Sequence, residues 1–356
     1  MTHDSAIIRR INAVAPTRIC DVGGWTDTWF ARYGSIFNIA VYPYAEVQVT
    51  VAERKDDRRV TINLENYNDS YTLVPELVKY DKNPLIEAAI DIMDIPEQYH
   101  FNINIHSNVP PGAATGTSAA ISVALVGALD ALTPGRMTAY EVAKTAHCIE
   151  TEKLNLQSGI QDQLCCAYGG INYIQMTEYP NASVSPVMVP NSIWWELENR
   201  LALVFIGEPH SSSEIHEKVI ESLGKNPSEH PALVRLRRLA EDAKNAVFQG
   251  DFGKLATAMS ENTEVQREMN SGLVCDKFQE IIDISRHNGA KGFKVNGAGG
   301  DGGTVTVLLP SAGRVLEPNL NAGAARLSGT RPKALQAHRK ADVSERATAE
   351  RGGQAP

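Results

Sequence analysis

The sequence predicts an α+β fold in two domains. The chain has 356 residues, about twice the ~150 residues that a domain typically needs. Segments with the patterns of strands and helices are mixed, without the regular alternation that builds a doubly wound parallel sheet. Long polar helices follow one another in the second half. We expect the first domain to span residues 1–180 and the second to span residues 181–310.

The predicted strands are rich in β-branched and aromatic residues or alternate in polarity. In chain order they are Phe37–Glu53, Arg59–Leu64, His100–His106, Gly170–Met176, Leu201–Gly207, Lys291–Asn296 and Thr304–Leu309. The segment Thr117–Leu132 is Ala-rich and apolar on most sides, which predicts a buried helix. The other predicted helices are Pro84–Met93, Thr138–Lys153, Ser212–Leu223, Ala232–Gln249, Phe252–Met269 and Lys277–Asn288.

The composition disfavours several classes of protein. The net charge of −8 provides no global basic field, so we expect no nucleic-acid partner. The apolar stretch Ala119–Leu129 is too short for a bilayer, which needs ~20 residues. The N-terminus lacks an apolar signal core, so we expect no membrane association and a cytoplasmic location. The five cysteines lack zinc-site spacing, and we expect the adjacent Cys165 and Cys166 in the core.

The composition changes after Pro310. Residues 311–356 contain no Phe, Trp, Tyr, Ile or Met, and they carry eight basic against four acidic residues. Such a segment buries little apolar surface, so we predict a disordered tail. A basic arm that binds nucleic acid is the alternative, which scattered charges without aromatic residues do not favour.

The segment Val109–Ala120 (VPPGAATGTSAA) predicts a phosphate-binding loop. Two prolines end the preceding strand, and Gly112 and Gly116 allow a ligand to approach the backbone closely. Thr117 and Ser118 begin the buried helix, where free N–H groups and the helix dipole favour an anion. A hydroxyl at this point can also ligate Mg²⁺ beside phosphates. The alternative is an ordinary N-cap on a core helix.

A second glycine-rich segment lies near the end of the folded chain. Five glycines occur within Gly297–Gly303, more than one hairpin needs. A strand follows these glycines, whereas a dinucleotide-binding motif requires a helix there, and the chain has no Walker A motif. A glycine loop between two strands lets a substrate or phosphate approach the backbone closely, and a flexible hairpin is the alternative.

Charged candidates lie in three other segments. Arg18 and Asp27 flank a Gly-Gly turn in APTRICDVGGWTD, where they can face a polar ligand or form a surface ion pair. Asp162 opens an apolar helix in SGIQDQLCCAYGG, twelve residues after Glu150. These two carboxylates can converge on a metal ion and a substrate hydroxyl, with helix capping as the alternative. The segment Gly207–His216 can hold a sugar or phosphate, although serines at a helix start are usually caps.

Together and in this order, these segments resemble the GHMP kinase superfamily. Its motifs look like P-G-R-x-x-x-x-G-E-H-T-D, P-P-G-x-G-L-G-S-S-A-A and K-x-x-G-A-G-x-G-G. The matching residues are Pro16, Arg18, Gly23, Thr26 and Asp27; Pro110, Pro111, Gly112, Gly116, Ser118, Ala119 and Ala120; and Lys294, Gly297, Ala298, Gly299, Gly302 and Gly303. The resemblance implies the two-domain GHMP kinase fold, with a ribosomal protein S5 domain 2-like N-terminal domain and a ferredoxin-like C-terminal domain.

The detailed form of the motifs resembles the sugar kinases of this superfamily. Gly-Gly-x-Thr-Asp and Gln-Asp-Gln…Tyr-Gly-Gly are similar to the branch of D-glycero-D-manno-heptose 7-phosphate kinase and fucokinase, and Gly159–Gln163 also fits galactokinase. This implies ATP-dependent phosphorylation of the anomeric C1 hydroxyl of a sugar or sugar phosphate. Gly24 and Trp25 replace the Glu-His of galactokinase, which argues against galactose. The mevalonate branch usually has Lys in place of Arg18 and is less favoured.

The resemblance also implies roles for individual residues. Asp162 and Arg18 are catalytic: the carboxylate orients the attacking hydroxyl, and the guanidinium stabilises the transferring phosphoryl group. The ATP phosphates bind a loop of Pro111, Gly112, Ala113, Ala114, Gly116, Thr117, Ser118 and Ala119. Mg²⁺ binds Ser118 and Glu150. The implied substrate-binding residues are Thr26, Asp27, Gly159, Gln161, His210, Ser212, Gly299, Gly300 and Asp301. ATP, Mg²⁺ and a sugar or sugar phosphate are thus the expected ligands, and a homodimer is compatible with the sequence.

Three residues of the phosphate loop depart from the family pattern. Ala114 and Thr115 replace the usual Gly-Leu, and Thr117 replaces a Ser, so an altered turn or weaker ATP affinity is expected. This change motivates one alternative, a non-catalytic homologue that binds a sugar or nucleotide. The retained Arg18 and Asp162 argue against it. Mevalonate-type kinase and diphosphomevalonate decarboxylase activities are further alternatives, and the first motif disfavours the decarboxylase.

Overall fold

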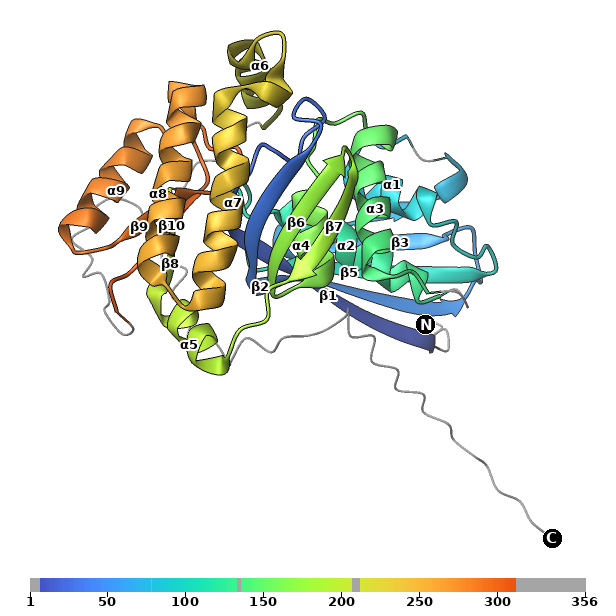
Figure 1. Cartoon of the computed structure of the whole chain (residues 1–356). Helices are drawn as coiled ribbons and strands as arrows, with labels where there is room; N and C mark the ends of the chain where they lie inside the picture. Colours follow the sequence, from blue (N-terminus) through green and yellow to red (C-terminus); the bar gives the residue numbers. More distant parts are fainter. Residues whose placement is uncertain (1–6, 78, 133–135, 207–211, 312–356) are drawn as a thin grey trace.

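The computed structural model describes residues 7–77, 79–132, 136–206 and 212–311. Two antiparallel-rich sheets with helices packed on them form the described part of the chain (Figure 1). The first sheet is large and comes from the first half of the chain, whereas the second is small and comes from the end. This mixed arrangement confirms the predicted α+β class.

The first sheet has seven strands. They are β1 (Ile7–Val22), β2 (Gly34–Glu53), β3 (Val60–Leu64), β4 (Asp69–Leu73), β5 (Tyr99–Ser107), β6 (Ile171–Glu178) and β7 (Asn181–Pro186). Their order is β4-β3-β5-β2-β6-β7, with β1 paired to β2. The long strand β2 pairs antiparallel with β1 along its length, with β5 through one half and with β6 through the other. It therefore connects the two wings of the sheet.

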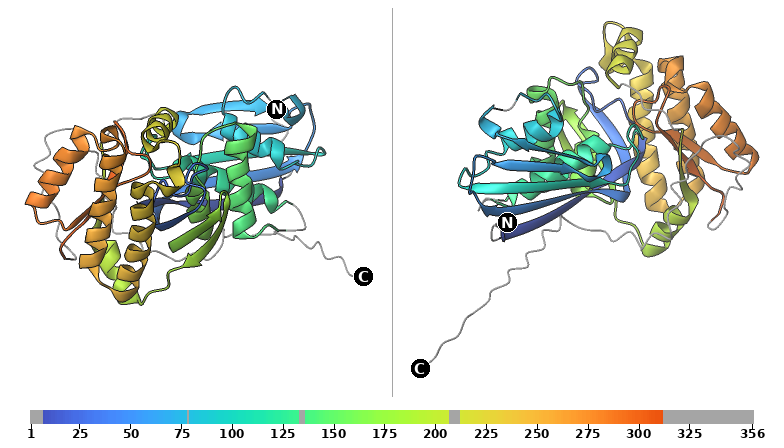
Figure 2. Two further views of the ribbon diagram at one scale, coloured as in Figure 1. Left: turned by 45° about the horizontal axis from the view of Figure 1, so that its top comes forward. Right: turned by 180° about the vertical axis from the view of Figure 1, so that it is seen from behind.

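Four helices pack with this sheet: α1 (Pro84–Ile92), α2 (Thr117–Asp130), α3 (Ala139–Cys148) and α4 (Gln161–Tyr168). Buried side chains alternate along β5, as they do in a strand with one covered face. Figure 2 shows the strands of this sheet in front of the helices when the molecule is seen from behind. The helix α2 is buried almost all round, which agrees with its uniformly apolar sequence.

The second sheet has the order β8-β10-β9 and is antiparallel. Its strands are β8 (Leu201–Phe205), β9 (Gly292–Val295) and β10 (Thr304–Leu308). The helices of this part are α5 (Asn191–Arg200), α6 (Ser212–Leu223), α7 (Pro231–Gln249), α8 (Phe252–Met269) and α9 (Asp276–His287). Helix α7 packs on β2 and α8 packs on β9, so these two helices join the sheets through one hydrophobic cluster.

The last six residues of β1, from Thr17 to Val22, are all buried. This strand end is covered on both sides, because α2 and α4 contact β1 and so do α7, α8 and β9. Functional side chains placed here are therefore held by elements from both halves of the chain.

Every predicted strand and helix is present, with shifts of a few residues at the ends. The predicted helix Thr138–Lys153 changes character at Ile149, where a π-helical turn covers Ile149–Lys153. The predicted ranges do not include the strands β1, β4 and β7 or the helix α5. Strand β7 is largely exposed and ends in a proline, so its sequence lacks a clear strand pattern. Of the predicted tail, residues 311–356, all but residue 311 lie outside the described residues. The domain limits at 180 and 310 remain predictions.

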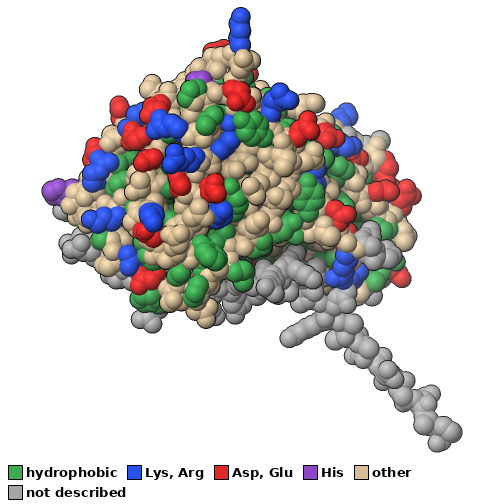
Figure 3. Space-filling view, in the orientation of Figure 1, with side chains coloured by type: hydrophobic (Ala, Val, Ile, Leu, Met, Phe, Trp, Pro, Cys, Tyr) green, Lys and Arg blue, Asp and Glu red, His purple; other side chains and the backbone are tan. Residues whose placement is uncertain are grey.

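The structure bears on what the composition predicted for cysteines, surface charge and membrane helices. Cys165 and Cys166 are both buried and free, which confirms the core interpretation. Basic and acidic side chains are interspersed over the face shown in Figure 3. Among the helices in the described ranges, none combines the length and apolarity that crossing a bilayer requires.

The packing of α2 can be tested by truncating a core side chain. Leu125 is fully buried, so Leu125→Ala should lower the free energy of unfolding by about 3 kcal/mol, measured by urea denaturation. Val234, which is 48% exposed on α7, provides the control, and Val234→Ala should cost less than about 1 kcal/mol. Equal effects of the two substitutions would contradict the buried placement of α2.

Candidate active site

Arg18 of β1 and Asp162 of α4 form a two-point ion pair. Arg18 Nε donates to Asp162 Oδ1 at 2.7 Å, and Nη2 donates to Oδ2 at 3.1 Å. Arg18 is 4% exposed, whereas the Asp162 side chain is 26% exposed. Burial opposes the charge of the guanidinium, but the negative charges of Asp162 and Asp21 outweigh it and raise the pKa of Arg18. A surface pair of Arg18 with Asp27, one sequence interpretation, is therefore wrong.

The same arginine is anchored to the predicted phosphate loop. Its backbone N–H donates to Thr115 O at 2.9 Å, and Nη1 donates to Ala114 O. Ala114 has a φ of 54°, in the left-handed region that the usual glycine of the family enters without strain. Ala114 O accepts a hydrogen bond from Arg18 in this conformation, so the loop and the arginine are joined at a residue that departs from the family pattern.

The N-terminus of α2 is open. Its N-cap is Gly116, at a φ of 72°, and no described side chain caps the helix. The N-cap alternative therefore takes the form of Gly116 without a side-chain cap, and the phosphate site stays a prediction. A Cβ on Gly116 would lie 3.1 Å from Asp162 Oδ2, so the carboxylate sits directly beside the helix start. Thr117 is half-buried and Ser118 is exposed in the first turn, where free N–H groups favour an anion.

A hydrogen bond from β10 fixes the part of the loop before Ala114. Ala113 is buried, and its carbonyl accepts from Thr304 Oγ1 at 2.8 Å. Pro111 is exposed, and Gly112 has a φ of 75°. Ala119 is buried in the first turn of α2. The loop thus directs carbonyl groups into the protein at Ala113, Ala114 and Thr115, and presents the helix start outward.

Glu150 lies in the π-helical turn after α3 and is 9% exposed. Burial raises its pKa to about 7, opposed by hydrogen bonds with Ser158 and Gln163, and the charge of Asp162 raises it further. The two carboxylates therefore lie within electrostatic reach of each other, as their spacing suggested. The described residues contain no group of three or more His, Cys, Asp or Glu side chains suited to a metal ion.

Asp27 lies at the N-terminus of α4. It is 3% exposed, and its Oδ2 accepts from the backbone N–H of Gln161 at 3.1 Å. A Cβ on Gly159 would lie 2.0 Å from that oxygen, so only glycine fits there. Burial raises the pKa of Asp27 to about 6. Gln161 is 6% exposed, and its Oε1 has no hydrogen-bond partner among the described residues.

Thr26 supports this site indirectly. It is fully buried, and its hydroxyl donates to Gly23 O at 2.7 Å. The hydroxyl also approaches Ser35 O at 3.2 Å. Thr26 therefore closes the Gly-Gly turn that positions Asp27, and the structure assigns its hydroxyl to that turn.

The second glycine segment joins β9 to β10, and its residue Gly297 lies beside Arg18. A Cβ on Gly297 would lie 3.4 Å from Arg18 Nη2. Gly299 packs on Leu273 and Gly300 packs on Ile215 of α6, while Asp301 is exposed. The segment connects two antiparallel strands as a hairpin. Gly297, near the start of this hairpin, also lies beside Ala114 and Arg18.

Two other predicted residues are not placed. His210 lies outside the described residues, and Ser212 begins α6 with a side chain that is likewise outside them. Further along α6, the His216 ring makes edge contacts with Trp25 and Trp29 at centroid distances of 5.2 and 5.7 Å. Helix α6 is thereby tied to the Gly-Gly turn region.

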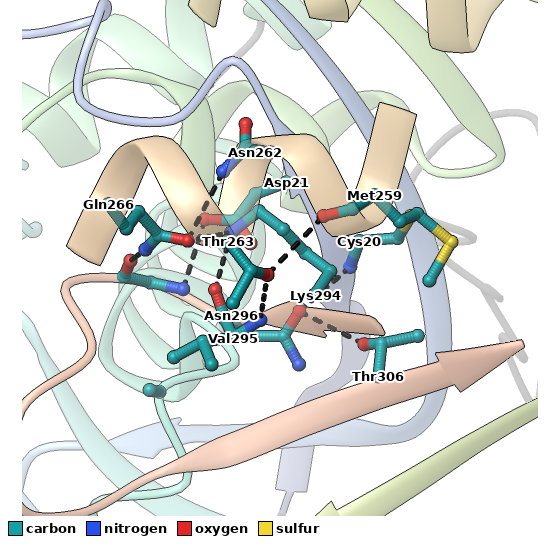
Figure 4. Close-up of polar contacts among 12 residues, drawn as sticks. Cys20, Asp21, Met259, Asn262, Thr263, Gln266, Lys294, Val295, Asn296 and Thr306 are labelled. Carbon is teal, nitrogen blue, oxygen red and sulfur yellow. Dashed lines mark hydrogen bonds and ion pairs between the residues drawn. The ribbon is translucent and has the colours of Figure 1, made fainter. Parts of the chain in front are cut away.

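Sequence reasoning missed Asp21 and recognised Lys294 only as a motif residue. The two form a fully buried ion pair between β1 and β9 (Figure 4). A signal was present, because each is a lone charge within an apolar strand, ICDV and FKV. Lone charges at buried strand positions usually have a partner of opposite charge.

Comparisons with known proteins agree with this arrangement. The N terminal domain of GHMP kinases matches residues 84–170, and the C terminal domain of GHMP kinases matches residues 239–325. The D-glycero-alpha-D-manno-heptose 7-phosphate kinase of Campylobacter jejuni is 30% identical over 305 residues, which are 83% of this chain and 88% of that protein. A mevalonate kinase of Thermococcus sibiricus is 28% identical over 252 residues, 68% of this chain and 69% of that protein.

A solved structure shows the same architecture. The D-glycero-D-manno-heptose 1-phosphate kinase of Bacteroides thetaiotaomicron superposes with a TM-score of 0.64 at 25% identity, over 84% of this chain and 88% of that one. The resemblance seen in the motifs is confirmed over most of the described chain. This protein belongs to the GHMP kinase family.

Proposed function

We propose that this protein is an ATP-dependent sugar kinase that phosphorylates the anomeric C1 hydroxyl of a sugar or sugar phosphate. The observation that carries the proposal is the placement of the Asp162 carboxylate, held by Arg18, at the open N-terminus of α2. A helix start binds phosphate, and a carboxylate beside it can receive a hydroxyl group. The heptose phosphate kinase relative supports a sugar acceptor.

The residues divide the chemistry of phosphoryl transfer between them. The loop from Pro111 to Ala119 and the first turn of α2 bind the ATP phosphates through backbone N–H groups. Asp162 orients the sugar hydroxyl and accepts its proton, while the hydroxyl oxygen bonds to the γ-phosphorus and the bond to the β,γ-bridging oxygen breaks, releasing ADP. Arg18 stabilises the negative charge on the transferring group.

Ser118 and Glu150 supply donors of the kind that Mg²⁺ takes. Ser118 supplies an exposed hydroxyl and Glu150 a carboxylate, and hard oxygen ligands of this kind suit that ion when phosphates complete its coordination. When bound, Mg²⁺ would neutralise charge on the phosphates. Glu150 and Ser118 would hold it.

The groups beyond Asp162 favour an acceptor rich in hydroxyls. Asp27 carries a carboxylate, and Gln161 has a buried carbonyl oxygen without a described partner. These acceptors need donors, which sugar hydroxyls supply and the carboxylate of a mevalonate-type acceptor does not. Gly159, Gly299, Gly300 and the remaining predicted residues stay predictions as substrate contacts. A mevalonate-type kinase is the second candidate, because a mevalonate kinase is also among the relatives.

The proposal is tested by a coupled ADP-release screen of hexoses, heptoses, their phosphates and mevalonate. We expect release with a heptose 7-phosphate or a fucose-like sugar, loss of the reducing end, and an anomeric phosphate in the phosphorus NMR spectrum. Release with mevalonate alone would establish the second candidate. ATP binding without release on any acceptor would make the protein a non-catalytic homologue.

The charge on Asp27 should reduce stability when no substrate is bound. Burial raises its pKa from 3.8 to about 6. Between these values the folded state holds more protons at Asp27 than the unfolded chain, so the free energy of unfolding falls as the pH rises through this range. Asp27→Asn removes this contribution. Its stability relative to wild type should increase by about 2–3 kcal/mol between about pH 4 and pH 7, measured by urea denaturation, whereas parallel pH profiles would contradict the assignment.

A further inference from the structure

An ion pair that the proposed mechanism does not use joins the two sheets. Lys294 Nζ of β9 lies 3.1 Å from Asp21 Oδ1 of β1, and neither residue is exposed. Lys294 also donates to Gln266 Oε1 of α8 at 3.2 Å and to Val295 O. Figure 4 shows the pair enclosed by side chains of α8 and the end of β9.

Stability alone does not account for this pair. Removing two charges from water costs several kcal/mol per ion, and apolar residues of similar volume often stabilise a core as well or better. Buried polar groups of this kind are best explained by a structural arrangement that they specify. The second oxygen of Asp21 indicates what that arrangement is.

Asp21 Oδ2 accepts from the backbone N–H of Gly297 at 3.0 Å. Gly297 begins the glycine loop at a φ of 62°. Gln266, the partner of Lys294, holds the same residue through its carbonyl, because Gln266 Nε2 donates to Gly297 O at 3.3 Å. Both polar groups of the Gly297 backbone are therefore fixed by the ion pair and its neighbour.

Gly297 in turn covers the inner side of the catalytic arginine. A Cβ at this position would lie 3.2 Å from Ala114 O and 3.4 Å from Arg18 Nη2. Ala114 O is the atom that accepts from Arg18 Nη1. A displacement of Gly297 would therefore free Ala114 O and the guanidinium group from their present positions.

We propose that Asp21 and Lys294 are positioning residues for phosphoryl transfer, which hold Gly297 against Ala114 and so keep Arg18 aligned with Asp162. The inference rests on the proposed kinase function. The buried ion pair thus has a role in turnover in addition to joining the two sheets.

The test compares Asp21→Leu, Lys294→Met and the double variant. Each single substitution leaves a buried polar group without its charge partner and should lower the melting temperature, and the double variant should recover most of that loss. Its kcat should nevertheless stay about 10- to 100-fold below wild type, with the KM for ATP and sugar changed less than about threefold. Hydrogen exchange at residues 297–303 should increase.

Thr263→Val is the matched control. Thr263 is buried, and its hydroxyl donates to Phe293 O at 3.0 Å and accepts from Val295 N at 3.2 Å, so none of its described hydrogen bonds is to Gly297. The variant should lower the melting temperature while kcat and exchange at 297–303 stay at wild-type values. Recovery of both kcat and melting temperature in the Asp21→Leu, Lys294→Met double variant would show a purely structural role and overturn the proposal.

A milder variant covers the case in which the double variant does not fold. Gln266→Met removes the hydrogen bond to Gly297 O and keeps the ion pair, so kcat should fall about threefold with faster exchange at 297–303. Wild-type kcat and exchange in that variant would overturn the proposal. If the wild-type protein transfers phosphate to no acceptor, the kinase function fails, while exchange at 297–303 still decides whether the pair fixes the loop.

Discussion

The bidentate contact between Arg18 and Asp162 is the interaction on which the site depends. The two residues lie 144 positions apart, and the contact requires that β1, α4 and the phosphate loop meet at one point. Arg18, which lies in β1, contacts α4 through Asp162 and the loop through Ala114 and Thr115. The Arg18 guanidinium is buried, whereas the Asp162 carboxylate is partly exposed. The carboxylate is therefore the member of the pair that a ligand can reach.

Negative charge accumulates around this contact at a cost. Four carboxylates, Asp21, Asp27, Glu150 and Asp162, share the region with two buried cations, Arg18 and Lys294. The raised pKa values of Asp27 and Glu150 record unfavourable burial of charge. A metal ion and hydroxyl donors from a substrate would relieve this cost. Functional sites commonly carry perturbed groups of this kind.

Much of the fold was predictable because its signals are local. The alternation in His100–His106 and the apolar surface of Thr117–Leu132 reflect burial directly, and both elements formed as predicted. The edge strand β7 escaped prediction because exposure removes the alternation that marks a strand. Local patterns were not enough to predict the site. From the spacing of Glu150 and Asp162, the sequence indicated only that these two carboxylates can converge. The pairing of Arg18 with Asp162, rather than Asp27, depends on tertiary contacts that the sequence does not encode locally.

The most direct test of the reaction centre is the turnover of Asp162→Asn, which keeps the shape of the side chain and removes its charge. With saturating ATP, Mg²⁺ and an accepted sugar, kcat should fall by ~10²–10⁴, while nucleotide affinity measured by calorimetry changes little. Asp283→Asn, at an exposed position on α9, should leave kcat unchanged. Turnover of Asp162→Asn near the wild-type rate would contradict the account, because the carboxylate at the helix start would then take no part in the transfer.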